Sequence, residues 1–192
     1  AIEKLHKAGL HLQAFKKRTQ IADIKKLEDT ETILMASSIL HNIGSLELSD
    51  YLVSKAFRLD RDHPRSINSK ATQIFHRRGA LQALLFIDKY EEQFKADAKI
   101  TSWWLSLKTE IYSFLRDFEQ ADYWFEKALE AKSDEVWVWV SRSLNLSSQD
   151  LYDESYEASK KAFELEPNNR TAIYGLASSL ILLQKDKEAL NA

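Results

Sequence analysis

The sequence predicts an all-α fold, a superhelix (solenoid) in which antiparallel helix pairs stack to form about four to five repeats. One observation is a recurring segment, in which a helix with small residues on one face is followed by a short turn and a second helix. The second helices carry an alanine or an aromatic residue at matching positions, Ala56, Tyr90, Ala128 and Ala162, which lie 34, 38 and 34 residues apart. The other observation is that the 192 residues include only four glycines and two prolines, too few for the many turns of a β-rich fold.

Residues 1–29 are predicted to form an N-terminal helical cap or a degenerate repeat. Their apolar residues recur at helical spacing, and basic residues occupy the other faces. These apolar residues are Leu5, Leu12, Phe15, Ile21, Ile24 and Leu27. A terminal repeat of a solenoid is often atypical because it needs one polar outer face. The chain begins with Ala1 and stops within the repeat pattern, so we expect it to be a piece of a longer protein.

Residues 30–192 are predicted to be the repeat array. Its repeats span about 30–63, 64–100, 101–133, 134–169 and a truncated 170–192. Pro64 and Pro167 mark boundaries, because proline cannot continue a helix. In each first helix, residues suited to the core recur at steps of three and four and therefore share one face. These residues are Ile33, Ala36, Ser37 and Leu40; Ile67, Ala71 and Ile74; Leu105, Thr109 and Tyr112; and Ile173, Leu176, Ala177 and Leu180.

The fourth repeat has two candidate registers for its first helix. Trp137, Val140, Ser141 and Leu144 fit one register, and Trp139, Ser143 and Leu146 fit the other. The two differ by two residues, and the sequence leaves both open.

On these residues the chain resembles the tetratricopeptide repeat (TPR) family over the span Thr30 to Ala192. The best matches are Tyr152-Asp153-Glu154 with Ala162 and Pro167, and Thr171-Ala172-Ile173-Tyr174 with Leu176-Ala177. No repeat keeps the family's usual glycine in the first helix, where Ser37, Ala71, Thr109 and Ala177 stand instead. Small residues still allow the paired helices to approach closely.

The resemblance implies a noncatalytic scaffold for protein–protein interaction, which binds a peptide or helix of a partner in a concave groove formed by the first helices. The residues expected to line this groove are Asn68, Thr72, His76, Trp103, Ser106, Glu110, Trp137 and Tyr174. The carboxylate clamp of chaperone-binding family members is absent, since Leu34, Ser38, Ser69 and Ser106 stand at its positions. Recognition of chaperone tails is therefore not expected.

The five tryptophans, Trp103, Trp104, Trp124, Trp137 and Trp139, lie within 37 positions. Neighbouring residues of a helix point about 100° apart, so Trp103 and Trp104 cannot both face one core. We expect Trp104, Trp124 and one of the pair Trp137 and Trp139 in the core. The others are expected to face the groove or an interface, where aromatic residues often anchor partners.

No pattern of catalytic, metal-binding or cofactor-binding residues is present in the sequence. Its five histidines are scattered without a His-Glu-x-x-His pair, its glycines form no phosphate loop, and it contains no cysteine. We therefore expect no enzyme activity, cofactor or metal within this segment. The alternative function is a regulatory or substrate-presenting arm of a larger enzyme, such as a glycosyl- or sulfo-transferase.

Charge is distributed unevenly along the chain. Residues 1–90 contain 15 Lys and Arg against 10 Asp and Glu, whereas residues 91–192 contain 12 against 19. This asymmetry either reflects solvated outer faces or helps to steer a partner, and it leaves self-association of copies open. Nucleic acid is not expected to bind, because the tryptophan-bearing half is acidic. No stretch is long and apolar enough for direct membrane insertion, and base rates favour the cytoplasm.

Overall fold

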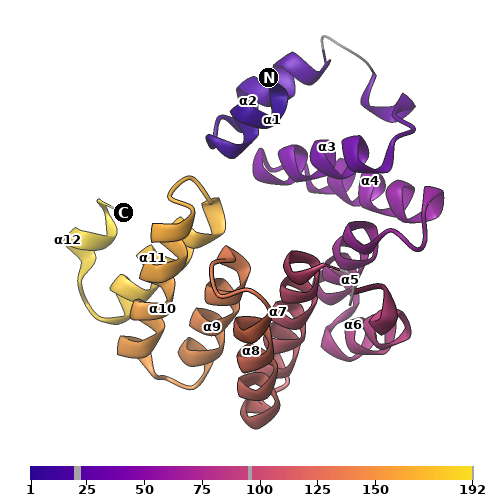
Figure 1. Ribbon diagram of the computed structural model, residues 1–192. Helices are drawn as coiled ribbons and strands as arrows, with labels where there is room; N and C mark the ends of the chain where they lie inside the picture. Colours follow the sequence, from indigo (N-terminus) through magenta and orange to yellow (C-terminus); the bar gives the residue numbers. More distant parts are fainter. Residues whose placement is uncertain (20–22, 95–96, 192) are drawn as a thin grey trace. The chain divides into compact units, whose positions relative to one another are not determined.

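The computed structural model describes residues 1–19, 23–94 and 97–191, and in these residues it contains α-helices and 3₁₀-helices but no strand (Figure 1). The predicted all-α fold is confirmed. Ile21, expected among the apolar residues of the first segment, lies outside the described residues. The chain divides into two compact units, residues 1–77 and 78–192, and each is considered by itself.

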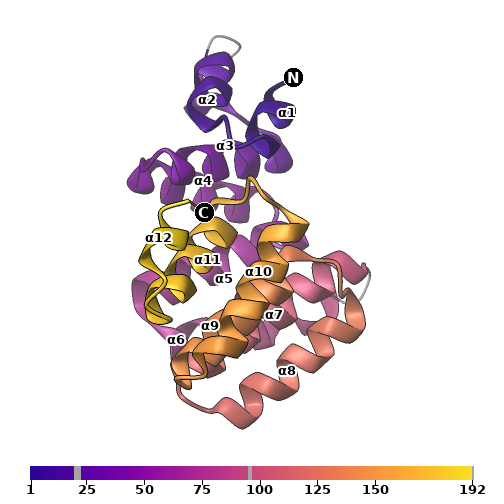
Figure 2. The same ribbon diagram turned by 90° about the vertical axis from the view of Figure 1, so that its left-hand side faces the viewer.

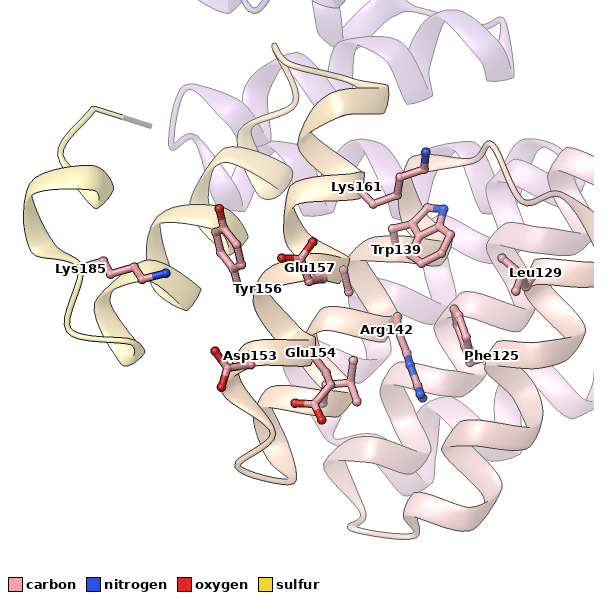
Figure 3. A pocket seen from close by; sticks show the side chains of 12 residues that line it. Phe125, Leu129, Trp139, Arg142, Asp153, Glu154, Tyr156, Glu157, Lys161 and Lys185 are labelled. Atoms are coloured by element: carbon pink, nitrogen blue, oxygen red, sulfur yellow. The ribbon is translucent and has the colours of Figure 1, made fainter.

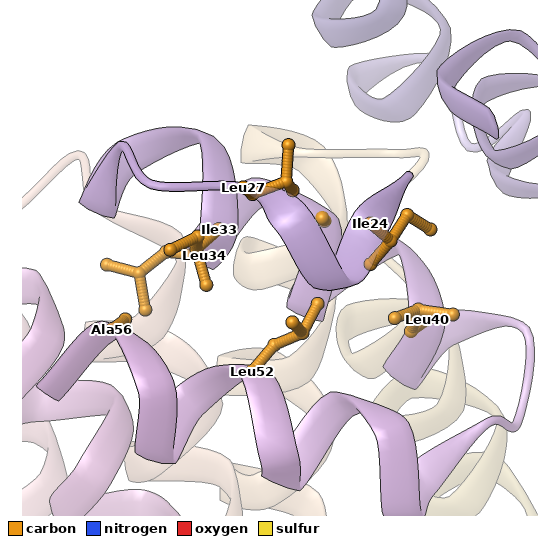
Figure 4. Close-up of a cluster of buried hydrophobic side chains, with 8 residues drawn as sticks. Ile24, Leu27, Ile33, Leu34, Leu40, Leu52 and Ala56 are labelled. Carbon is orange, nitrogen blue, oxygen red and sulfur yellow. The ribbon is translucent and has the colours of Figure 1, made fainter. Parts of the chain in front are cut away.

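The first unit contains three short N-terminal helices followed by longer ones. These are α1 (Ile2–Lys7), α2 (His11–Thr19), the 3₁₀-helix η1 (Ile24–Lys26), α3 (Thr30–Asn42), α4 (Leu46–Leu59) and α5 (Pro64–Arg78). The helix α3 begins where the Asp29 side chain accepts a hydrogen bond of 2.8 Å from the Thr32 backbone N–H, a typical helix cap. Ile24 and Leu27 pack over α3 and α4, against Ile33 and Leu52 (Figure 4). The first segment therefore shares the core of the first helix pair.

The second unit is a stack of helix pairs. Its elements are α6 (Ala80–Ile87), the 3₁₀-helix η2 (Asp88–Phe94), α7 (Ala98–Phe114), α8 (Phe118–Ala131), α9 (Val136–Ser148), α10 (Tyr152–Leu165), α11 (Arg170–Leu182) and α12 (Asp186–Ala189). Within it α7 packs on α8 and α9, and α9 packs on α10 and α11 (Figure 2). Each first helix thus contacts its own partner and the next first helix, as in a solenoid.

Tyr90, one of the four matching positions of the repeat pattern, does not lie in a regular helix. The α-helix after Gly79 ends at Ile87, and the chain continues as 3₁₀-helix with a non-helical backbone at Tyr90 (φ −121°, ψ 20°). Ala83 and Ile87 are fully buried. The buried apolar face of α6 is therefore formed by residues that precede Tyr90. The half-buried Tyr90 packs on Phe86 instead, with ring centroids 5.1 Å apart.

Most turns between paired helices share a left-handed backbone. One residue with φ between 60° and 92° occurs in each turn, and these residues follow one another at intervals of 34 to 37 positions. They are Gly9, Gly44, Gly79, Arg116, Asp150 and Gln184. Gly79 precedes α6 with a different backbone (φ 92°, ψ 169°), whereas Gly44 forms a left-handed turn after α3. The last three turns adopt the same conformation without glycine, at a cost in backbone strain.

Small residues stand where paired helices approach most closely, and two of the pairs are joined by serine hydroxyls. The Oγ atoms of Ser37 and Ser49 lie 3.0 Å apart between α3 and α4, and those of Ser143 and Ser155 lie 3.2 Å apart between α9 and α10. Thr109 is fully buried on α7, and its hydroxyl donates to the Leu105 carbonyl. Ser37 and Thr109, which stand where the tetratricopeptide pattern has glycine, therefore keep their hydroxyls paired.

Candidate functional site

The first helices of the second unit expose one row of side chains that the core does not use. On α9, Trp137 is 39% exposed and Leu144, seven residues later, is 43% exposed. In contrast, Ser143 and Leu146 are buried, and Trp139 is half-buried against Val136 and Val140. All members of the second register, Trp139, Ser143 and Leu146, therefore lie toward the core. The first register is mixed, since Val140 and Ser141 are buried and Trp137 and Leu144 are exposed.

On α11 the row continues with apolar side chains of similar spacing. Tyr174 is 73% exposed and Leu182 is 43% exposed. Both line a small hollow of about 70 Å³ together with Leu144 of α9, so α9 and α11 present one continuous apolar surface. Serine side chains, among them Ser147 and Ser178, complete the lining. The tetratricopeptide resemblance singled out Tyr174, and the helical spacing from Trp137 and Tyr174 could have identified Leu144 and Leu182 as well.

On α7 the predicted residues Trp103, Ser106 and Glu110 follow the same helical spacing. Trp103 is half-buried, and the Nζ atom of Lys99 lies 5.2 Å from its ring centroid, a weak cation–π contact. Ser106 is buried, and its Oγ has no hydrogen-bond partner in the described residues. This part of the row is therefore more enclosed than that on α9 and α11.

Glu110 is the unusual titratable group of the row. Burial raises the pKa of Glu110 to about 7, because a carboxylate loses hydration there. Among the residues that the structure describes, it has neither a hydrogen-bond partner nor an ion-pair partner to offset that loss. A hydrogen-bond donor or a cation that reaches a carboxylate in this state stabilises it.

Three of the predicted groove residues belong to the first unit. On α5 the Thr72 hydroxyl donates to the Asn68 carbonyl at 3.0 Å. His76 is exposed at the end of this helix, where partial desolvation of the ring and then the nearby His41 lower the pKa of His76. The structure thus groups Trp103, Ser106, Glu110, Trp137 and Tyr174 in one unit and Asn68, Thr72 and His76 in the other.

The expected tryptophan environments are observed for the most part. Trp104 is 4% exposed and stacks on Phe94, with ring centroids 5.3 Å apart and planes 5° from parallel. Trp124 is half-buried and meets Trp104 edge to face at 6.4 Å. Trp139 is the member of the later pair that packs on the core, and its indole N–H donates to the Ser133 carbonyl at 2.8 Å at an exposed position.

A larger hollow opens on another side of the second unit. It has a volume of about 720 Å³ and lies over α9 between α8 and α10 (Figure 3). Phe125, Trp139 and Leu146 supply apolar surface, and Arg142 lies beside them. The sequence does not indicate this hollow, because its lining comes together only when three helices and the segment before α12 pack.

The described residues contain no group of three or more His, Cys, Asp and Glu side chains that could hold a metal ion. In the same residues no helix is long and apolar enough to cross a membrane.

A sequence model of the family described as "Tetratricopeptide repeat" matches residues 108–135, which include the end of α7, all of α8 and the turn that follows. Comparison with curated protein sequences gives no match.

Three solved structures illustrate the likeness in fold. The chain is 15% identical to MamA, residues 41 to the end, from Desulfovibrio magneticus RS-1, covering 84% of this chain and 89% of that one with a TM-score of 0.49. It is 20% identical to the P58(IPK) TPR domain over 97% of this chain and 55% of that one, with a TM-score of 0.49. It is 15% identical to YrrB, described as a TPR protein with an unusual peptide-binding site, over 93% and 88%, with a TM-score of 0.46. Likenesses this distant say nothing about what this chain binds.

Proposed function

Because the chain is a tetratricopeptide-type helical repeat protein, we propose that it is a noncatalytic module that binds a segment of a partner protein. The proposed site is the row of side chains on the first helices of the second unit, here called the first-helix face. Its members are Trp103, Ser106 and Glu110 of α7, Trp137 and Leu144 of α9, and Tyr174 and Leu182 of α11. A peptide or an amphipathic helix of the partner fits such a row.

The exposure of Leu144, Tyr174 and Leu182 around one hollow is the observation that carries this proposal. Large apolar side chains that cluster on a surface commonly mark interaction sites. Trp137, on the face of α9 that carries Leu144, adds an aromatic group of the kind that often dominates binding energy. The surface therefore favours a partner segment with apolar side chains.

Glu110 gives the proposed site a preferred polar contact. Its carboxyl is poorly hydrated and lies in the row with Trp103 and Ser106. A basic side chain or an N–H group of the partner would replace the lost hydration. We therefore assign to the partner segment a donor or a cation beside its apolar anchors.

The remaining predicted residues, Asn68, Thr72 and His76, are proposed to form a similar surface on α5 of the first unit. This surface is more polar than that of the second unit, since it offers an amide, a hydroxyl and an imidazole. The alternative function, an arm of a larger enzyme, stays a prediction.

Selection of peptides from a displayed random library on the full chain tests the proposal. We expect the selected peptides to bind Tyr174→Ala and Trp137→Ala variants at least about tenfold more weakly, because aromatic anchors contribute more than about 1 kcal/mol each. A Tyr51→Ala variant is the matched control, because Tyr51 is 45% exposed on α4 and lies off the first-helix face. Peptides that bind all variants with equal affinity would contradict the proposed site.

A further inference from the structure

Three of the five histidines stand at one position of successive repeats, close to the end of each first helix. They are His6, His41 and His76, each 35 residues from the next and three residues before the glycine of a turn. Equivalent positions of stacked repeats lie next to one another, so these side chains form a histidine row along α1, α3 and α5 of the first unit. The equivalent residues of the second unit are Ser113, Ser147 and Ile181.

His6 joins two neighbouring helices through its two ring nitrogens. Its Nδ1 lies 3.0 Å from Nδ1 of His11, the first residue of α2. Its Nε2 lies 3.0 Å from Oγ of Ser38 on α3. Since α1 and α2 form a hairpin, His6 connects this hairpin to the first helix of the next pair.

The contact between the two imidazoles depends on their protonation. A neutral imidazole has one N–H donor and one acceptor nitrogen, whereas a protonated ring has two donors and no acceptor. Two Nδ1 atoms 3.0 Å apart therefore form a hydrogen bond only while at least one ring is neutral. When both rings are protonated, two N–H groups and two positive charges face each other, and the contact becomes repulsive.

The surroundings of His6 oppose its protonation. Burial lowers the pKa of His6, and His11 and the Arg65 guanidinium of α5 lower it further. On α1 itself, Glu3 is one turn away but is paired with Lys7 at 2.8 Å. The folded first unit therefore binds a proton at His6 less readily than the unfolded chain does, and its stability falls as pH drops below about 6.5.

The hairpin has little buried surface of its own to hold it against α3. No residue of α1 is buried, and only Ala14 and Arg18 of α2 are. Phe15 adds a partly buried ring that packs on the core cluster of the first unit. The polar contacts of His6 therefore contribute a large share of the attachment.

A second pair of the histidine row is coupled more weakly. Partial desolvation lowers the pKa of His76, and the nearby His41 lowers it further, while Asp50 raises it and Arg77 lowers it. Both rings are exposed, so solvent screens their repulsion. The partly buried contact of His6 is therefore the most acid-sensitive point of the row.

We propose that the contact between His6 and His11 makes the first unit open in acid: when both rings are protonated, the α1–α2 hairpin separates from α3 and uncovers the surface around Ser38. The proposal concerns the packing of the first unit and does not depend on the proposed function. In the second unit Glu110 acts in the opposite direction, because its raised pKa makes that unit more stable as pH falls. Acid therefore loosens one unit and stabilises the other.

Hydrogen exchange of the full chain at pH 7.0 and pH 5.5, corrected for the intrinsic pH dependence of exchange, tests the proposal. Exposed carboxylates stay ionised over this range, so histidines are the main titrating groups of the first unit. We expect the amides of α2 to exchange at least about fivefold faster at pH 5.5, because a hydrogen bond is lost and two like charges remain. The amides of α9, in the second unit, should not exchange faster at pH 5.5.

His6→Gln and His11→Gln each remove one titrating ring of the pair. Both should abolish the acid-dependent increase, because a second proton no longer enters the contact. His63→Gln is the matched control, since Nε2 of His63 lies 3.2 Å from Oε1 of Glu31 and protonation of His63 breaks no contact there. This variant should retain the full increase.

Nuclear magnetic resonance titration of the histidine rings distinguishes a lost proton coupling from a hairpin that a substitution loosens at every pH. In the unchanged chain, His6 and His11 should titrate as a coupled pair in two steps. In His11→Gln, His6 should titrate in one step at higher pH. Independent one-step titration of both rings in the unchanged chain would overturn the proposal. So would an acid response that is absent from α2, equal in α9, retained in both pair variants or lost in His63→Gln.

Discussion

The Nζ atom of Lys108 lies 4.3 Å from the ring centroid of Trp124, inside the second unit. It lies 4.5 Å from the Trp104 ring centroid and 3.0 Å from Asp88 Oδ1, and the lysine side chain is only 6% exposed. Lys108 therefore joins η2, α7 and α8 through one charged group. A desolvated cation between two indole rings is among the stronger cation–π arrangements.

Truncation of this lysine should destabilise the second unit. We expect Lys108→Ala to lower its free energy of unfolding by about 2–4 kcal/mol, because the buried stem and the contacts with both rings are lost. Lys108→Met keeps most of the stem and should cost clearly less. Tryptophan fluorescence during urea unfolding measures this unit alone, since all five tryptophans lie in residues 78–192. Equal effects of the two substitutions would show that the cation, not the packing of the stem, dominates.

Glycine at the left-handed turns should stabilise the chain. Arg116 and Gln184 have φ values of 61° and 60°, where a side chain costs about 1–2 kcal/mol. Part of the gain is lost to the greater entropy of glycine in the unfolded chain. We expect Arg116→Gly and Gln184→Gly each to raise the unfolding free energy by about 0.5–1 kcal/mol, and Asp150→Gly by less, since aspartate tolerates this region better.

The reverse substitution at Gly79 is the control for that prediction. A Cβ atom built there meets no atom within 4 Å, and φ is 92°. With ψ at 169°, Gly79 lies in a region that essentially only glycine occupies, so Gly79→Ala should destabilise by about 1–3 kcal/mol through backbone strain alone. A stabilising Gly79→Ala variant, or Arg116→Gly and Gln184→Gly variants that melt earlier than the unchanged chain, would contradict the strain argument.

Glu110 should make the second unit less stable as pH rises. The pKa of Glu110 is about 7 in the folded chain and about 4.5 in an exposed position. The folded state therefore binds its proton more tightly, and stability falls as pH rises from about 4.5 to 7, by up to about 3 kcal/mol. Below pH 4.5 both states are protonated, and above pH 7 the loss is complete.

Glu110→Gln should remove this dependence, because an amide does not ionise. Urea unfolding at pH 5 and pH 8, followed by tryptophan fluorescence, measures the difference between the variant and the unchanged chain. The variant should gain stability at pH 8 relative to the unchanged chain and gain little at pH 5. Glu126→Gln, on an exposed position of α8, is the matched control. A pH dependence that persists in Glu110→Gln would place the titrating group elsewhere.

The helix pairs could be predicted because their determinants are local. Ala56, Ala128 and Ala162 are fully buried, as the repeat spacing indicated. The burial of Lys108 could not be predicted from the sequence, since lysine is usually a surface residue. Its contacts with Trp104, Trp124 and Asp88 form only when the helices pack. Gly79, Arg116, Asp150 and Gln184 follow one another at intervals of 34 to 37 positions. The repeat register therefore indicates the last three turns even though they lack glycine.

The candidate site was predictable only in part. Trp137 and Tyr174 proved to be exposed on first helices, and both belong to the proposed face. The burial of Glu110 depends on the neighbouring helices, which periodicity does not describe. The hollow of about 720 Å³ combines residues of α8, α9 and α10 with Lys185, so its lining is set by packing between repeats.

The serine pair between α9 and α10 should behave as a coupled unit. The Ser155 hydroxyl donates to the Ser143 carbonyl at 2.9 Å, and it also lies 3.2 Å from the Ser143 hydroxyl. Each is buried, so Ser143→Ala and Ser155→Ala should each cost about 0.5–1.5 kcal/mol in urea unfolding. The double variant should cost less than the sum, because Ser155→Ala alone leaves the buried Ser143 hydroxyl without its partner, and the double variant removes that hydroxyl as well. Ser155→Val should cost more, about 1–3 kcal/mol, since added methyl groups separate helices packed at this distance. Additive effects of the two alanine substitutions would show that the hydroxyls act independently and that only residue size sets the helix spacing.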